Sequence, residues 1–176
     1  VFVEEGGFFL NNEMDDFSSK AGHPNFYGLI GSEANSIQPG KRMLSSMTPS
    51  IILKDSKPSL IVGTPGGSTI ITSVLQTILN VYEFDLSVQE AVNAPRFHHQ
   101  WLPDVVIFEE GIINKEKDSI LKSKSYFVIS LPIEVDTGGM SARSSIGAVD
   151  AILIDEEGKV STGADFRGDD YGEILK

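Results

Sequence analysis

The stretch SLIVGTPGGSTIITSVLQTILNVYEF, residues 59–84, joins an apolar run to a helical repeat through a glycine pair. Its first six residues follow another apolar run at 50–55, and the pair predicts an antiparallel hairpin that is largely buried. Beyond the glycines, apolar residues recur at helical spacing and predict a helix with one wide apolar face, capped by Ser68 or Thr69. That face comprises Ile70, Ile71, Val74, Leu75, Ile78 and Leu79.

Local signals elsewhere predict further hairpins and helices. Residues 1–10 read as two short strands around a Gly-Gly turn, and residues 148–165 as a hairpin turning at 155–158. Ser87 and Glu90 form a capping box that opens a short helix, which Pro95 ends. Residues 115–123 read as a charged, exposed helix. This mixture predicts an α+β layered fold, with residues 1–176 as a single domain.

Residues 20–40 are rich in glycine, proline, asparagine and serine, and they predict a long loop. A loop of that length inside a compact domain is usually a functional, lid-like segment or is disordered. Tyr27 lies within it, either as an exposed aromatic side chain or as the tip of a lid over a pocket.

Composition excludes several classes of function. The chain has 14 Lys and Arg against 25 Asp and Glu, a formal net charge of −11, which opposes binding to nucleic acid or to anionic lipid. It contains no cysteine, so neither a disulfide framework nor a thiolate nucleophile is available. No apolar run is long enough to cross a bilayer. The first ten residues lack the features of a signal peptide and read like the middle of a strand, so we expect a piece of a longer protein.

The glycine pair in TPGGS, residues 64–68, has two interpretations. Glycines between a strand and a helix allow a sharp turn and leave unpaired N–H groups at the helix start. Such groups suit an anion, which could be a phosphate, a carboxylate or the oxyanion of acyl transfer. The alternative is a tight strand-to-helix turn without a ligand. The pair lacks the lysine of a nucleotide-binding P-loop.

Three other polar segments are ambiguous taken singly. NNEMDDF, residues 11–17, is either an acidic surface turn or a set of hydrogen-bond acceptors for an ammonium group. LSSM, residues 44–47, carries two serine hydroxyls that lie either in a surface turn or in a pocket as hydrogen-bond donors. The segment 165–170 reads as a solvated end. Adjacent His98 and His99 would point to opposite faces of an extended chain, which favours packing or local hydrogen bonding over a metal site. We therefore expect no metal and no cofactor, and no local Ser-His-acid motif is recognisable.

Taken in order, four segments resemble the γ-glutamyltransferase (γ-glutamyltranspeptidase) family. They are LNNEMDDFS at 10–18, PGKRMLSSMTPSIIL at 39–53, VGTPGGSTIITSVLQ at 62–76 and AVNAPRFHHQWLPD at 91–104. The resemblance covers nearly the whole chain and corresponds to most of the small subunit. It implies the four-layer αββα sandwich of the N-terminal nucleophile hydrolases, present here in part.

The resemblance also implies a mechanism. In the family a precursor cleaves itself, and the new N-terminal Thr of the small subunit attacks the γ-carbonyl of glutathione or another γ-glutamyl compound, with its own α-amino group as base. The acyl-enzyme then passes its γ-glutamyl group to water, an amino acid or a dipeptide. A large subunit from the same precursor is the expected partner, and an exported or cell-surface location (periplasmic, secreted or membrane-anchored) is implied by resemblance alone.

Carried over residue by residue, the resemblance implies a pocket for a zwitterion. Its acidic pole holds the substrate α-ammonium group, its hydroxyl pole meets the α-carboxylate, the glycine amides face the oxyanion, and a tyrosine covers the site. The residues are, in that order, Glu13 and Asp16, Ser45 and Ser46, Gly66 and Gly67, and Tyr27. Loss of either carboxylate would leave an ammonium group poorly paired, at a cost of about a few kcal/mol of binding.

Departures from the family pattern limit what this chain can do alone. The Thr nucleophile, its neighbouring strands and the large-subunit Arg that binds the α-carboxylate are not in the chain. Thr69 stands where many bacterial members carry Arg, and Phe166 interrupts the usual DPR. The isolated chain is therefore expected to be inactive and, because strand edges and apolar surface would be exposed, poorly soluble.

Two other functions compete with this one. The missing nucleophile favours a catalytically inactive homologue that only binds γ-glutamyl or amino-acid ligands, although truncation of the sequence explains that absence more simply. A related acylase could cleave a glutaryl-type side chain, but such an enzyme would not need the acidic pair Glu13 and Asp16.

Overall fold

Residues 2–25, 27–133 and 146–175 are described by a computed structural model of the chain. The chain divides into two compact units, Val1–Ser45 and Ser46–Lys176, each of which is considered by itself. The expectation of a single domain over residues 1–176 stays a prediction. In the described ranges no helix is long and apolar enough to cross a membrane.

The first unit is mostly irregular chain. It contains the antiparallel strands β1 (Phe2–Val3) and β2 (Phe8–Phe9) and two short 3₁₀ helices, η1 (Glu13–Asp16) and η2 (Glu33–Asn35). The strand–turn–strand prediction for the start of the chain is confirmed, except that Val1 lies outside the described residues. In the predicted long loop at 20–40, the described residues form turns and η2 without longer regular structure.

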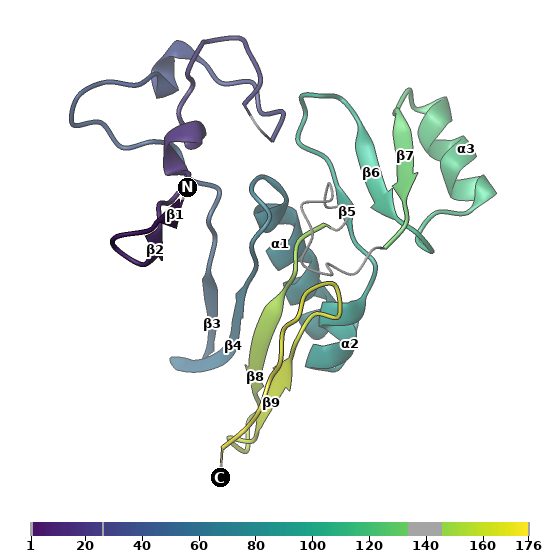
Figure 1. The fold of residues 1–176 in the computed structure, drawn as a ribbon. Helices are drawn as coiled ribbons and strands as arrows, with labels where there is room; N and C mark the ends of the chain where they lie inside the picture. The colour runs from purple at the N-terminus through teal and green to yellow at the C-terminus, as the bar shows by residue number, and fades with distance from the viewer. Residues whose placement is uncertain (1, 26, 134–145, 176) are drawn as a thin grey trace. The chain divides into compact units, whose positions relative to one another are not determined.

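The second unit is built on a four-stranded antiparallel sheet in the order β3-β4-β8-β9. Its strands are β3 (Ser50–Lys54), β4 (Lys57–Gly63), β8 (Asp150–Ile154) and β9 (Val160–Gly163), and both predicted hairpins are present. Helices α1 (Thr69–Tyr82) and α2 (Val88–Asn93) cover one face of this sheet (Figure 1). The capping box at Ser87 and the helix end before Pro95 are confirmed.

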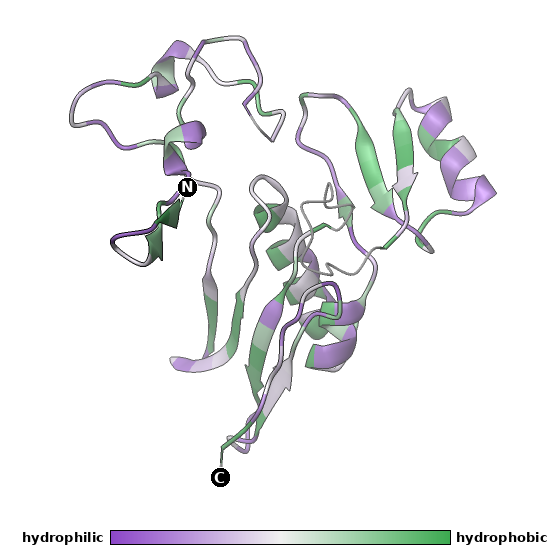
Figure 2. Ribbon diagram, viewed as in Figure 1, coloured by the Kyte–Doolittle hydropathy of each residue, from purple (hydrophilic) through white to green (hydrophobic). Residues whose placement is uncertain are grey.

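A smaller three-stranded sheet, β5-β6-β7, extends the same unit. It consists of β5 (Phe97–His98), β6 (Val106–Glu109) and β7 (Val128–Leu131), with β6 and β7 parallel. Helix α3 (Lys115–Ser123) is the crossover between these two strands, and it buries no residue, as its charged sequence predicted. Figure 2 shows that most residues of α3 are hydrophilic, whereas most residues of β6 and β7 are apolar.

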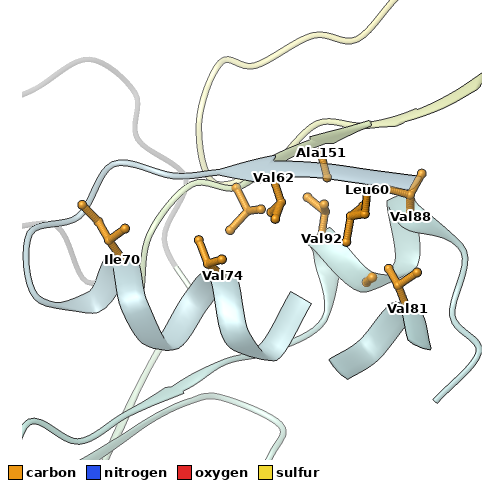
Figure 3. Packing of buried hydrophobic residues seen from close by; sticks show 10 residues of the cluster. Leu60, Val62, Ile70, Val74, Val81, Val88, Val92 and Ala151 are labelled. Atoms are coloured by element: carbon orange, nitrogen blue, oxygen red, sulfur yellow. The ribbon is translucent and has the colours of Figure 1, made fainter. Parts of the chain in front are cut away.

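The core of the second unit lies between the large sheet and the two helices. Leu60 and Val62 of β4 face Val74 of α1 and Val92 of α2, as Figure 3 shows. Leu60 and Val92 have no exposed surface. Burial of such side chains stabilises the fold by roughly 1.5–3 kcal/mol each.

Two predictions about burial were wrong. The hairpin is not largely buried, because β3 is an edge strand on which Ile51 and Leu53 are 64% and 59% exposed. Helix α1 does not bury one wide apolar face, since Ile71 and Leu75 remain exposed beside the buried stripe. A sheet contacts only one stripe of a helix, so α1 buries the small polar residues Ser73 and Thr77 along with its apolar contacts.

Candidate active site

The glycine turn, Gly66–Gly67, connects β4 to α1 in a backbone conformation that favours glycine. The φ angles are +136° at Gly66 and +58° at Gly67. A Cβ atom on Gly66 would lie 2.5 Å from the Thr69 hydroxyl oxygen, so a side chain is excluded by contact as well as by conformation. The predicted tight turn is therefore present.

Hydrogen bonding leaves the amide groups of this turn available. The carbonyl of Gly66 accepts bonds from the Thr69 amide at 3.2 Å and the Thr69 hydroxyl at 2.9 Å, and the carbonyl of Gly67 accepts from the Ile70 amide. Within the described residues, the N–H groups of Gly66 and Gly67 donate no hydrogen bond. The turn thus presents donors beside the positive end of a 14-residue helix, an arrangement that suits a developing anion.

Neither predicted cap of α1 forms. Ser68 makes no capping bond, and its hydroxyl donates instead to Gln100 Oε1 at 2.7 Å. The Thr69 hydroxyl bonds the Gly66 carbonyl rather than a free amide. The first amides of the helix therefore have no side-chain acceptor from this turn, and those of Thr69 and Ile70 bond the backbone carbonyls of Gly66 and Gly67 instead.

A second glycine packs against the turn from behind. Gly147, at φ +73°, lies so close that an added Cβ would be 2.7 Å from Thr64 Oγ1. The Thr64 hydroxyl accepts a hydrogen bond from the Ala148 amide at 2.9 Å. This segment is held in turn by Arg96, whose Nη1 donates to the Gly147 carbonyl at 3.4 Å. The backing of the glycine turn is thus built from residues distant in sequence.

Arg96 belongs to a buried quartet of two arginines and two carboxylates, Arg96, Glu109, Asp165 and Arg167. Each of the four is at most 1% exposed. Arg167 binds both oxygens of Glu109 in a fork, at 2.9 and 2.6 Å, and reaches Asp165 at 2.9 Å. Arg96 binds the other oxygen of Asp165 at 2.5 Å. Two positive and two negative charges therefore neutralise one another inside the unit.

The prediction of a solvated end at 165–170 was wrong for its first part. Asp165 is buried because Arg96 and Arg167 supply its counter-charges and the Val149 and Arg167 amides bond its oxygens. Burial opposes its charge, but these partners hold the pKa of Asp165 below its usual value. Arg96 lies 69 positions from Asp165, and Arg167 lies 58 from Glu109, so these two pairs leave no local pattern in the sequence. Only Arg167 and Asp165 are near neighbours, two positions apart, and that spacing alone does not indicate a buried quartet.

His98 and His99 make hydrogen bonds to neighbouring side chains, as we predicted. His98 is buried, with Nδ1 2.9 Å from the Thr72 hydroxyl and Nε2 2.9 Å from Gln100 Oε1. Burial lowers the pKa of His98 and favours its neutral form. His99 contacts Asp104 at 3.0 Å instead. No group of three potential metal ligands occurs among the described residues.

The acidic turn, η1, places two predicted binding residues in one short segment of the first unit. Glu13 and Asp16 are both half-buried. Their carboxylates have no ion pair and no hydrogen bond within the described part of the chain, in contrast to Asp165. Phe17, 6% exposed, anchors the C-terminal end of the turn. Among the described residues, the arrangement leaves these two carboxylates without a counter-ion.

Asn35 is a residue of this unit that sequence reasoning missed. Its side-chain Nδ2 donates to the Asp16 carbonyl at 2.7 Å, and its Oδ1 accepts from the Leu44 amide at 3.0 Å. It therefore joins the acidic turn to the residue that precedes Ser45. An asparagine in a loop is a common turn residue, so its type alone indicated nothing more.

The remaining predicted residues are placed as follows. Tyr27 is 36% exposed, and its amide bonds Asn25 Oδ1 at 3.0 Å, while Asn25 Nδ2 donates to the Asp15 carbonyl at 3.3 Å. Ser45 is exposed and ends the first unit, whereas Ser46 is half-buried and begins the second. The first unit thus holds the acidic pair, Tyr27 and Ser45, and the second holds Ser46 and the glycine turn.

Comparison with known proteins agrees with the resemblance seen in the motifs. The family profile of gamma-glutamyltranspeptidase matches residues 1–175. The chain is 43% identical over 170 residues to a glutathione hydrolase proenzyme of Escherichia coli, covering 97% of the chain and 27% of that protein. It is 44% identical over 179 residues to one from Pseudomonas aeruginosa, covering 100% and 30%. The chain therefore spans less than a third of the length of these relatives.

Solved structures give the same result for the fold. The gamma-glutamyltranspeptidase of Pseudomonas nitroreducens complexed with L-DON superposes with a TM-score of 0.84 at 42% identity, covering 100% of this chain and 86% of that one. A cephalosporin acylase from Bacillus halodurans, at 23% identity and a TM-score of 0.63, shows a likeness of fold alone. The predicted α+β class and the likeness to N-terminal nucleophile hydrolases are confirmed. On the profile match and these identities, the chain belongs to the gamma-glutamyltranspeptidase family.

Proposed function

We propose that this chain is the substrate-binding part of an enzyme that transfers or hydrolyses γ-glutamyl groups, glutathione among them. The observation that carries the proposal is the glycine turn, which has positive φ angles and whose Gly66 and Gly67 amides donate to none of the described residues. Membership of the family and the name glutathione hydrolase, carried by relatives at 43–44% identity, support it.

In this proposal the nucleophile is an N-terminal Thr outside the chain, activated by its own amine. Its oxygen bonds to the carbonyl carbon of the γ-glutamyl group, and the carbonyl oxygen becomes an oxyanion that Gly66 and Gly67 stabilise through their N–H groups. Collapse breaks the C–N bond, and the leaving amine takes the proton removed from the nucleophile. Water or an acceptor amine then attacks the acyl-enzyme and regenerates the Thr.

The headgroup of the substrate is bound through its two charges. Glu13 and Asp16, which pair with no cation among the described residues, hold the α-ammonium group, and the hydroxyls of Ser45 and Ser46 donate to the α-carboxylate. Tyr27 covers the headgroup as a lid. We also propose that a large subunit from the same precursor completes the site and that the mature enzyme is exported or held at the cell surface.

Two alternatives predict different behaviour. An inactive binding homologue would hold γ-glutamyl ligands without turnover, and a glutaryl-type acylase would have no use for the acidic pair. The names of the relatives favour γ-glutamyl chemistry over both.

The test is to express the complete precursor and measure chromophore release from γ-glutamyl and glutaryl anilides side by side. The proposal expects release from the γ-glutamyl anilide that exceeds release from the glutaryl anilide. A self-cleaved, folded protein that binds glutamate but releases nothing would support the inactive homologue. Preference for the glutaryl anilide would support the acylase.

A further inference from the structure

Asn35 connects three segments of the first unit through its main chain and side chain: its own turn, residues 16–18, and Leu44. Its amide donates to the Ser32 carbonyl at 3.0 Å, and its carbonyl accepts from the Ser18 amide at 2.9 Å. Its side chain donates to the Asp16 carbonyl at 2.7 Å and accepts from the Leu44 amide at 3.0 Å. Both ends of one carboxamide are therefore engaged with backbone groups.

The two side-chain bonds reach backbone positions next to opposite poles of the proposed pocket. Asp16 carries a carboxylate assigned to the α-ammonium group, and Leu44 immediately precedes Ser45, which is assigned to the α-carboxylate. A carboxamide is planar and rigid. It therefore sets the separation between the backbone points from which an acid and a hydroxyl project.

Only a carboxamide of this length meets both requirements. The Asp16 carbonyl needs a donor, while the Leu44 amide needs an acceptor. An aspartate at position 35 would keep the acceptor but place a second oxygen against the Asp16 carbonyl. An alanine would leave both backbone groups without this partner.

Contacts at Ser18 hold the Asn35 segment beside the acidic turn. Ser18, whose amide donates to the Asn35 carbonyl, is 7% exposed and also forms a parallel bridge with Ser36. Gly31 approaches so closely that an added Cβ would clash with the Ser18 hydroxyl. The Asn35 segment is therefore fixed to residues 16–18, and the exposed Leu44 is linked to it through the Asn35 side chain.

We propose that Asn35 is a positioning residue that sets the spacing between the two poles and thereby selects a zwitterionic α-amino-acid headgroup. This inference rests on the proposed function. A headgroup with a carboxylate but no ammonium group contacts only one pole, so its binding depends less on that spacing. The hydrogen bonds of Asn35 to described residues all stay within the first unit and include no group of the glycine turn, so the loss should affect recognition of the headgroup rather than the chemical step.

The experiment uses the complete, processed enzyme as wild type, Asn35→Ala and Asn35→Asp. Measured quantities are KM and kcat for a γ-glutamyl anilide, together with inhibition constants for L-glutamate and for glutarate. For Asn35→Ala we expect KM to rise about 10-fold with kcat within about 3-fold, which corresponds to the loss of one or two hydrogen bonds. The preference for glutamate over glutarate should fall by a similar factor, and Asn35→Asp should lose at least as much.

A matched control separates positioning from stability. Asn114 caps α3 in the second unit by accepting from the Lys117 amide at 2.8 Å, so Asn114→Ala also deletes an asparagine hydrogen bond. It should lower the melting temperature while KM and the inhibitor preference stay at wild-type values. The inference is overturned if the Asn35 variants lower only the amount of active enzyme and keep wild-type KM and preference.

Two further outcomes are distinguishable. If neither Asn35 variant yields processed subunits, the residue supports folding of the precursor rather than headgroup spacing, and the inference is overturned. If the wild-type precursor itself releases nothing from the anilide, it is the proposed function that fails.

Discussion

Two carboxylate-bearing segments of this chain look alike in sequence and behave in opposite ways. In the second unit, Asp165 is 1% exposed and bound by two arginines and two backbone amides. In the first unit, Glu13 and Asp16 are half-buried, and their carboxylates have no partner within the described residues. The difference teaches that a carboxylate with its counter-charge inside the protein serves the fold, whereas one without remains available to a ligand.

Electrostatics explains why the two environments have separate uses. Burying an ion pair costs more in lost hydration than a surface pair does, so the quartet persists only because each charge is matched and hydrogen-bonded. At the acidic turn, the carboxylates keep part of their contact with water and remain accessible to a cation from outside the protein. An α-ammonium group would pair with these carboxylates as Arg96 pairs with Asp165.

The largest effect should follow from breaking the quartet. Arg167→Met would leave Glu109 without its forked partner and Asp165 with one arginine, at a cost of about 3–5 kcal/mol of unfolding free energy. We expect the complete precursor to unfold in less denaturant and to mature poorly. Chemical denaturation followed by circular dichroism, with subunit formation on a gel, measures both.

Arg167→Lys provides the matched comparison. A lysine keeps the charge but cannot form the fork to Glu109, so the unfolding free energy of Arg167→Lys should lie between those of wild type and Arg167→Met. Equal stability of all three proteins would show that the quartet does not stabilise the fold.

The acidic turn should respond in activity instead of stability. Asp16→Asn removes a charge that no described residue pairs, so unfolding should change by about 0.5 kcal/mol or less. If Asp16 holds the α-ammonium group, kcat/KM for a γ-glutamyl anilide should fall by about 100-fold, equivalent to a few kcal/mol. Steady-state kinetics on the processed enzyme provides the measurement.

Glu4→Gln is the control for loss of one negative charge in the same unit, because Glu4 is exposed in the turn between β1 and β2. It should retain wild-type kinetics. Unchanged activity in Asp16→Asn would contradict the proposed zwitterion pocket. It would also contradict the contrast between the acidic turn, assigned to a ligand, and Asp165, assigned to the fold.

The next effect concerns the pH dependence of stability, to which the buried carboxylate of Asp165 should contribute. Since the pKa of Asp165 is lowered in the folded state, its stabilising contribution is full above the unfolded pKa and is lost as the pH falls through the folded pKa. Unfolding free energy should therefore decline below about pH 4, the usual aspartate range. In Asp165→Asn this decline should be shallower, as acid titration monitored by tryptophan fluorescence or circular dichroism would show.

Comparison of prediction and structure shows which information was local. The capping box at Ser87, helix 115–123 and both hairpins of the large sheet depend on residues a few positions apart, and their patterns predicted them. Glycine between a strand and a helix likewise predicted the turn at Gly66. These features could be read because backbone conformation depends on near neighbours.

What the sequence could not predict depends on pairing between distant segments. Arg96 meets Asp165 across 69 positions, and Asn35 meets Asp16 across 19. The exposure of Ile71 on α1 depends on how much of the helix the sheet covers. The type of a residue shows which interactions it can make, but the tertiary fold determines which distant residue becomes its partner.

The smallest effect is expected at an ion pair that lies on the surface. Lys54 and Glu156 join the two hairpin turns of the large sheet at 2.5 Å, with side chains 60% and 73% exposed. Hydration and salt weaken such pairs, so Glu156→Gln should leave the unfolding midpoint unchanged within error at physiological ionic strength. Any shift should appear only at low salt, in contrast to Arg167→Met, whose loss should persist at high salt. If thermal unfolding showed comparable losses for both variants, burial would not be what separates structural charges from surface ones in this protein.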